Sequence, residues 1–131
     1  MKLLLDTHLL LWAAGASPRL PAEARDLILE PGTEPMASAA SLWQVAIENA
    51  LGRADFRVDP HLLRRGLADN GYTELPVTGA HAVEAGLLPP PHRDPFDRML
   101  IAQARVEGIL LLTADRTLAR YPGPIRALTA G

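Results

Sequence analysis

The sequence predicts a single α/β domain spanning residues 1–131, with a short, mainly parallel central sheet flanked by helices on both faces. Two apolar runs without alternation, KLLL and ILLLT, are typical of strands that are buried on both faces. Stretches with helical periodicity lie between such runs. Alternation of strands and helices favours a parallel sheet covered on both sides.

Short apolar or β-favouring runs mark the expected strands: residues 2–5, 34–38, 73–77 and 109–113, with 125–128 as an edge strand. Helical patterns, bounded by Pro, Gly and polar caps, mark the expected helices: a stretch through residue 14, then 22–30, 38–52, 60–70, 79–87, 95–108 and 115–121. Ser38 or Ser41 is the expected cap of the third of these helices, which ends at Gly52.

The amino-acid composition excludes several classes of protein and site. The chain has no cysteine, which excludes disulfides, a thiolate zinc site and an iron–sulfur cluster and is compatible with a cytoplasmic protein. The formal net charge of −2 argues against tight non-specific binding to DNA, which needs many basic residues. A metal-dependent nucleic-acid enzyme remains allowed, because a bound cation inverts the local field of an acidic site. No apolar run reaches the roughly 20 residues that span a bilayer, so no membrane association is expected.

Acidic residues follow the apolar runs. Asp6 ends the first strand, Asp115 follows the strongest one, and Asp97 lies in HRDPFDRMLIAQA. Side chains just beyond the carboxyl ends of parallel strands carry the chemistry of many α/β proteins. If the two strands are neighbours, Asp6 and Asp115 lie near each other, and a hard cation such as Mg²⁺ would relieve the repulsion between carboxylates. Asp6, Asp97 and Asp115 are therefore the candidate metal ligands and catalytic residues.

Helix capping is the alternative explanation for each acid taken alone. Asp is a favoured N-cap, so Asp6 and Asp115 could cap the helices that follow them. Asp94 with Pro95 and Asp97 resembles a capping box, and Asp97 would also interact favourably with the helix dipole. Capping alone does not require acids at the ends of both the first strand and the strongest later one, which favours the shared site.

The motifs LLDTHLLLW, SAASLWQVAIENALGR, HRDPFDRMLIAQARVEG and LLTADR together resemble PIN-domain ribonucleases, most closely the VapC-type toxins of bacterial toxin–antitoxin pairs. The family's aspartates match Asp6, Asp97 and Asp115. The resemblance implies a PIN-like domain that acts as a Mg²⁺- or Mn²⁺-dependent endoribonuclease. It also implies an RNA substrate, a homodimer and a cognate antitoxin that neutralises the enzyme. Helices 22–30 and 60–70 are the candidate antitoxin surfaces.

One position departs from the family pattern. The family usually places Glu directly after the Trp of the third helix, but this chain has Gln44 there and an acid one turn later, Glu48. Residues four apart share a helix face, so Glu48 is a candidate substitute, although a solvated surface charge is the alternative. Gln44 can offer a neutral oxygen but cannot act as a base, which favours one metal ion over two.

Other residues are secondary candidates. Thr7 and Thr113 lie beside two of the acids and could orient water, with strand-end hydrogen bonding as the alternative. Arg98 and Arg116 could contact a phosphate or lie on a solvated face. Four scattered histidines do not suggest a zinc site. Trp12 and Trp43 are expected in the core or at a dimer interface rather than stacked on bases. Asp94 resembles a further acid of the family, but a role as a helix cap is sufficient to explain it. The secondary candidates are Asp94, Thr7, Thr113, Arg98 and Arg116.

The competing function is a catalytically weak PIN domain that binds RNA or a protein without cutting, and Gln44 is the feature that favours it. A receiver domain and a haloacid-dehalogenase-type phosphatase do not fit, because they require a second acid beside the first strand's Asp6 and, for the receiver, a late lysine. For the enzyme, Asp6→Asn or Asp97→Asn is expected to abolish cleavage with a similar or higher melting temperature.

Overall fold

The computed structural model describes residues 1–53, 57–90 and 94–128 and shows one five-stranded sheet in the order β3-β2-β1-β4-β5. Every pair of neighbouring strands is parallel, which confirms the predicted α/β class. His92, one of the four histidines, lies outside the described residues. The strands are β1 (Lys2–Leu5), β2 (Glu34–Ser38), β3 (Thr73–Leu75), β4 (Leu110–Thr113) and β5 (Ile125–Ala127).

Helices connect the strands as the sequence predicts, with one difference in type. Residues 116–120, expected as a short helix, form a 3₁₀ turn (η2, Arg116–Arg120) instead. The segment is short, as 3₁₀ turns generally are. The α-helices are α1 (Thr7–Ala14), α2 (Ala22–Leu29), α3 (Ala39–Ala50), α4 (Pro60–Asp69), α5 (Gly79–Leu87) and α6 (Pro95–Glu107).

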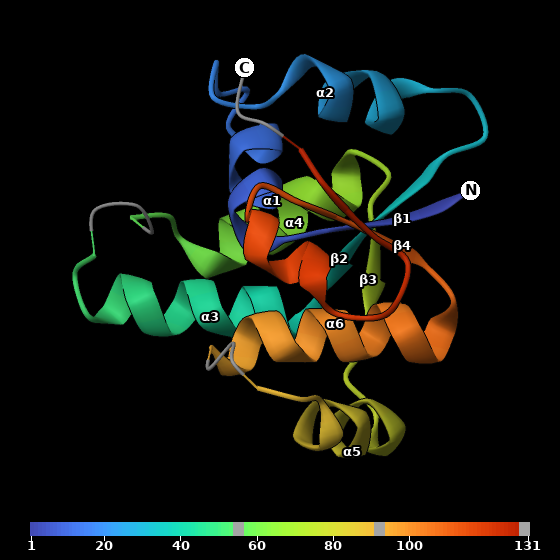
Figure 1. Cartoon of the computed structure of the whole chain (residues 1–131). Coiled ribbons are helices and arrows are strands. Elements are labelled where there is room, and N and C mark those ends of the chain that lie inside the picture. Colours follow the sequence, from blue (N-terminus) through green and yellow to red (C-terminus); the bar gives the residue numbers. More distant parts are fainter. Residues whose placement is uncertain (54–56, 91–93, 129–131) are drawn as a thin grey trace.

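Two hydrophobic layers cover the faces of the sheet (Figure 1). Successive side chains of a strand point to opposite faces, so Leu3 and Leu5 join one layer and Leu4 joins the other. The first layer packs against α1, α2 and α4, and the second packs against α6 and η2, with α5 outside α6. All three leucines are fully buried, and each contributes roughly 1.5–3 kcal/mol through burial.

The topology places the carboxyl ends of the two central strands side by side. β1 pairs with β4 in the register Leu5 to Leu112, so the next residues along each chain, Asp6 and Thr113, lie at the same edge. Gly108 makes this arrangement possible, because its left-handed backbone (φ 67°) ends α6 and turns the chain into β4. The edge therefore brings together residues more than 100 positions apart.

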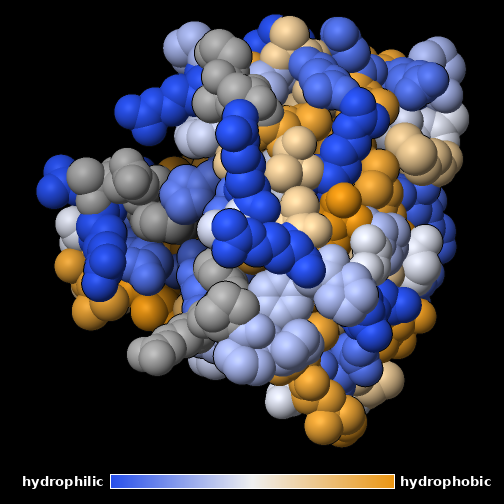
Figure 2. All heavy atoms as spheres, in the orientation of Figure 1, coloured by the Kyte–Doolittle hydropathy of each residue, from blue (hydrophilic) through white to orange (hydrophobic). Residues whose placement is uncertain are grey.

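The surface carries both hydrophilic and hydrophobic side chains. Figure 2 shows long hydrophilic side chains lying over one face, with hydrophobic side chains gathered in separate patches between them. No helix in the described part of the chain is long and apolar enough to cross a membrane.

Candidate active site

Asp6 is a buried carboxylate at the centre of the edge. It is 6 % exposed and accepts three hydrogen bonds. Its Oδ1 accepts from the backbone of Leu9 at 2.8 Å, which caps α1. Its Oδ2 accepts from Thr113 Oγ1 at 2.6 Å and from the backbone of Ala114 at 2.9 Å. Since a carboxylate offers about four lone-pair positions, one remains for a further ligand.

Thr113 links the two aspartates that follow the central strands. Its hydroxyl donates to Asp6 and accepts from the backbone N–H of Asp115 at 3.0 Å. The Asp115 side chain accepts from Thr117 N at 2.9 Å and from Thr117 Oγ1 at 2.7 Å, which caps η2. The capping alternative is therefore confirmed for Asp115 and for Asp6. The Asp6 cap leaves a lone-pair position for a shared site. The Asp115 cap competes with such a site, because the Asp115 carboxylate faces Thr117 and it is the backbone N–H of Asp115 that bonds to Thr113.

Gln44 faces the same edge from α3. It is 8 % exposed, and its Oε1 lies 2.7 Å from Thr7 Oγ1. The Thr7 hydroxyl also lies 2.9 Å from Ser41 Oγ, and it can donate to only one of the two at a time because it has one proton. Thr7 follows Asp6 directly, so the amide of Gln44 is held next to the candidate metal ligand. Ordinary strand-end hydrogen bonding thus describes Thr7 better than water orientation.

Glu48 lies one turn further along α3 and pairs with a cation. Its Oε2 is 2.8 Å from Arg53 Nε, and the Glu48 side chain is 19 % exposed. The ion pair is poorly aligned, since the same buried oxygen receives no hydrogen bond with acceptable geometry. Glu48 is consequently neither a fully solvated charge nor a residue bonded to Asp6. Its place in the site remains a prediction.

Asp97 and Asp94 begin α6. Asp94 is the N-cap and accepts from Phe96 N at 2.9 Å and, at 3.5 Å, from Asp97 N, which confirms its predicted cap role. Asp97 lies half-buried in the first turn, where the helix dipole favours a negative charge. The start of α6 lies beside α3 in Figure 1, and the two helices contact each other.

The two candidate arginines differ in how the fold uses them. Arg98 donates to the carbonyls of Ala85, Leu88 and Pro89, so its guanidinium holds the end of α5 against α6. This engagement favours a structural role over phosphate binding for Arg98. Arg116 is exposed at the start of η2, directly after Asp115.

Comparison with known proteins identifies the family. The model of the PIN domain family matches residues 3–124, which is most of the chain. The chain belongs to the PIN domain family. No curated protein matches this PIN domain by sequence.

Solved structures share the fold of this PIN domain. VapBC2 from Rickettsia felis, bound to a DNA fragment from its promoter, has a TM-score of 0.71 at 13 % identity, covering 98 % of this chain and 99 % of that chain. DNA-bound VapBC from Salmonella typhimurium has a TM-score of 0.67 at 19 % sequence identity, and the match covers 100 % of this chain and 99 % of that chain. VapC20 from Mycobacterium tuberculosis, a toxin that cleaves the sarcin–ricin loop, has a TM-score of 0.61 at 14 % sequence identity. This match covers 89 % of this chain and 92 % of that chain.

The donor chemistry of the PIN domain fits a hard divalent cation. Asp6 is held by neutral donors and keeps a lone-pair position, and Asp97 and Asp115 add carboxylate oxygens of the kind that Mg²⁺ prefers. Among residues 1–53, 57–90 and 94–128, however, no three acidic or histidine side chains lie close enough as they stand to hold one ion. A common ion would require side-chain rotation, for example of Asp115 away from Thr117. The ligand set therefore remains a prediction.

A second buried polar group was not found by sequence reasoning. Ser38 Oγ donates to Gln103 Oε1 at 2.6 Å, and Gln103 Nε2 donates to the carbonyl of Pro76 at 3.2 Å. His81, fully buried, accepts from the backbone of Thr78 and lies 2.7 Å from Glu107. The sequence signal that could have revealed this group is the presence of polar residues, His81 and Gln103, at positions on the buried faces of α5 and α6. This group holds the end of β2 against both helices.

The tryptophans differ in their surroundings. Trp12 packs partly buried against the first hydrophobic layer, as expected. Trp43 is 65 % exposed, so the expectation of a core position is wrong for this residue. The reason is helical geometry: the buried face of α3 is taken by Ser41, Gln44 and Val45, which turns Trp43 outward.

Proposed function

We propose that this PIN domain is a Mg²⁺- or Mn²⁺-dependent endoribonuclease that hydrolyses RNA phosphodiester bonds and serves as the toxin of a toxin–antitoxin pair. The observation that carries the proposal is Asp6, a buried carboxylate at the carboxyl end of a central strand with one lone-pair position left. Membership of the PIN family and the fold shared with VapBC and VapC20 support it.

The residues have distinct roles in this proposal. A divalent ion, when bound, stabilises charge on the scissile phosphate and lowers the pKa of a water molecule. Asp6 provides the fixed ligand, because its three donors hold the carboxylate in one orientation. Asp97 and Asp115 provide further carboxylates. Gln44 contributes a neutral oxygen beside Thr7, and Glu48 is the remaining acid on the same helix face.

Cleavage of a labelled RNA by the purified chain tests the enzyme. We expect cleavage with Mg²⁺ or Mn²⁺ and none in EDTA. Asp97→Asn and Asp115→Asn should each lower the rate by at least 100-fold, on the order of what is lost with one electrostatic group of an active site. Asp59→Asn is the matched control, because Asp59 also caps a helix but ends no strand.

The control separates catalysis from capping. Asp59 accepts from His61 N and Leu62 N, and Asn caps helices about as well as Asp, so this variant should cleave normally. Cleavage by the Asp97 and Asp115 variants at the wild-type rate would refute the assignment.

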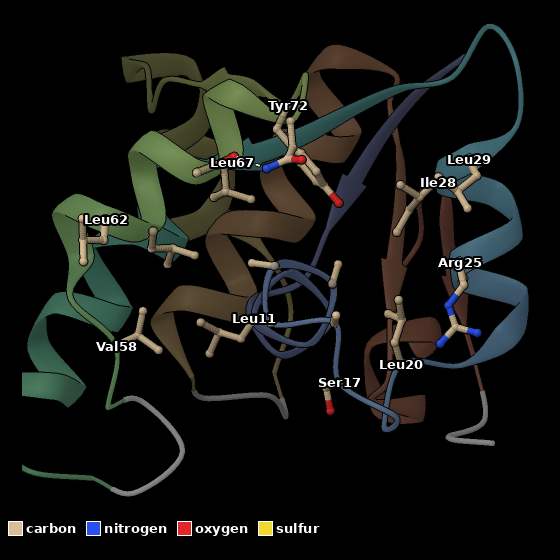
Figure 3. Close-up of a pocket in the computed structure, with 17 residues that line it drawn as sticks. Leu11, Ser17, Leu20, Arg25, Ile28, Leu29, Val58, Leu62, Leu67 and Tyr72 are labelled. Carbon is tan, nitrogen blue, oxygen red and sulfur yellow. Dashed lines mark hydrogen bonds between the residues drawn. The ribbon is translucent and has the colours of Figure 1, made fainter.

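We assign the antitoxin to a groove of about 700 Å³ between α1, α2 and α4. Figure 3 shows Ile28 and Leu29 of α2 on one side, Leu62 and Leu67 of α4 on the other, and Leu11 of α1 between them. Both predicted antitoxin surfaces line this groove. None of the candidate catalytic residues does, so an antitoxin that blocks RNA must extend beyond it.

The antitoxin assignment has its own test. Leu62 is 60 % exposed, and Leu62→Glu should abolish capture of the cognate antitoxin while RNA cleavage is retained. Val83, 64 % exposed on α5, supplies the control Val83→Glu, which should bind the antitoxin normally. Retained binding by Leu62→Glu would exclude this groove.

A catalytically weak PIN domain that binds RNA or a protein is the second candidate, and one observation favours it. Gln44 occupies a buried position with its oxygen engaged by Thr7, so it is structurally satisfied without a charge. RNA binding without cleavage at any divalent-ion concentration would support this function. A homodimer is proposed with either function, and its test is the molar mass in solution.

A further inference from the structure

Two aromatic residues directly precede candidate site residues in the sequence, on the helices that carry them. Trp43 directly precedes Gln44 on α3, and Phe96 directly precedes Asp97 on α6. Their ring centroids are 5.5 Å apart with an interplanar angle of 73°, an edge-to-face arrangement. Helices α3 and α6 therefore each carry an aromatic residue that is followed in the sequence by a candidate site residue.

The exposure of Trp43 is unusual for an anchored ring. The edge-to-face contact with Phe96 favours one orientation of the indole. Yet 65 % of Trp43 remains open to solvent, whereas Phe96 is half-buried. A fixed and accessible indole is suited to bind a flat aromatic ligand, because little side-chain entropy is lost on binding.

We propose that Trp43, supported by Phe96, stacks on an unpaired base of the RNA next to the scissile phosphate. This inference rests on the proposed function and concerns an unpaired stretch of its RNA substrate. Bases stack on exposed aromatic rings in single-strand binding sites, and such stacking tolerates any sequence because every base has a π-face. Phe96 positions the indole at the start of α6, one residue before Asp97, so a base stacked on the indole would lie at the end of α6 that carries this carboxylate.

Fluorescence provides a direct test. The chain has two tryptophans, so Trp12→Phe leaves Trp43 as the single emitter. Adding a short oligouridylate or oligoadenylate in EDTA, which prevents cleavage, should quench this emission. An abasic oligonucleotide of equal charge should not quench it. Unchanged emission with both base-containing oligonucleotides would overturn the proposal, whatever the oligomeric state of the protein.

Affinity measurements complete the test. Trp43→Ala should weaken oligonucleotide binding by roughly 5- to 150-fold, and Trp43→Phe by less. Leu51→Ala is the matched control, because Leu51 follows the same helix and is also 65 % exposed; its affinity should equal wild type. A Trp43→Ala protein that changes from dimer to monomer with unchanged affinity would assign Trp43 to the dimer interface and refute stacking.

The outcome is separable from that of the proposed function. Quenching without cleavage in Mg²⁺ or Mn²⁺ would support stacking and refute the ribonuclease. Cleavage without quenching would support the ribonuclease and refute stacking.

Discussion

Replacing Asp6 by Asn tests whether hydrogen bonding or charge repulsion dominates at the strand ends. The carboxylate accepts from Leu9 N, Thr113 Oγ1 and Ala114 N. An asparagine has one oxygen and one NH₂ group, so it cannot accept on both sides. If its oxygen faces Leu9, the NH₂ group faces the N–H of Ala114, and that donor loses its partner.

The structure decides the sign of the effect. A buried donor without a partner costs about 1–3 kcal/mol. Relief of repulsion is expected to be smaller, because no three acidic side chains of the described residues lie close enough to share an ion, and the repulsion between two charges falls as their separation grows. We therefore expect Asp6→Asn to lower the melting temperature by roughly 4–12 °C, at about 4 °C per kcal/mol for a domain of this size. This replaces the sequence-based expectation of similar or higher stability.

Thermal denaturation in EDTA is the appropriate assay, because it removes any contribution from bound metal. Asp59→Asn should change the melting temperature little, since its cap bonds are kept. Thr113→Val removes one of the three donors, and its effect should be non-additive with that of Asp6→Asn because the two side chains are in contact. An Asp6→Asn protein at least as stable as wild type in EDTA would refute the hydrogen-bond reasoning.

Three further predictions concern single positions. Gln44→Glu keeps the contact with Thr7 but adds a charge at a buried position, so it should lower the melting temperature in EDTA and increase the rise caused by Mg²⁺; equal rises in both proteins would contradict this. Gly108→Ala should cost about 1–2 kcal/mol in denaturant unfolding, because its φ of 67° disfavours any side chain, and an unchanged midpoint would contradict the strain. Burial raises the pKa of Tyr72, so the folded state holds this proton more tightly than the unfolded state. Its stabilisation is complete below the unfolded pKa of about 10 and is lost as pH rises through the folded pKa; Tyr72→Phe should flatten the alkaline decline measured by urea unfolding.

Local sequence signals predicted most of the fold. Asp94-Pro95 and Gly108 bound α6 because capping and left-handed turns depend on a few adjacent residues. The unbroken apolar runs of β1 and β4 predicted strands buried on both faces, and those strands are indeed central. Such signals act over a few residues and need no knowledge of the partner strand.

The site could be predicted only in part, because its contacts join distant segments. Asp6 was identifiable as a strand-end acid, but its bonds to Thr113 and Ala114 depend on β1 lying next to β4. The engagement of Arg98 by backbone carbonyls depends on how α5 packs against α6, which no local pattern encodes. The core position expected for Trp43 was wrong for a similar reason: the pattern of an amphipathic helix does not reveal which polar residues the core accepts.

Gln44 affects the charge of the site more than its architecture. A glutamate at this position could still accept from Thr7, so the hydrogen bond does not require the amide. The amide instead removes one negative charge from a position that is 8 % exposed, where an additional carboxylate is costly unless a cation is bound. The fold is thereby relieved of a buried charge, while the proposed metal site would depend on the remaining aspartates for its attraction to a cation. If the chain cleaves RNA, its dependence on Asp6 should therefore be stronger than its dependence on any acid of α3.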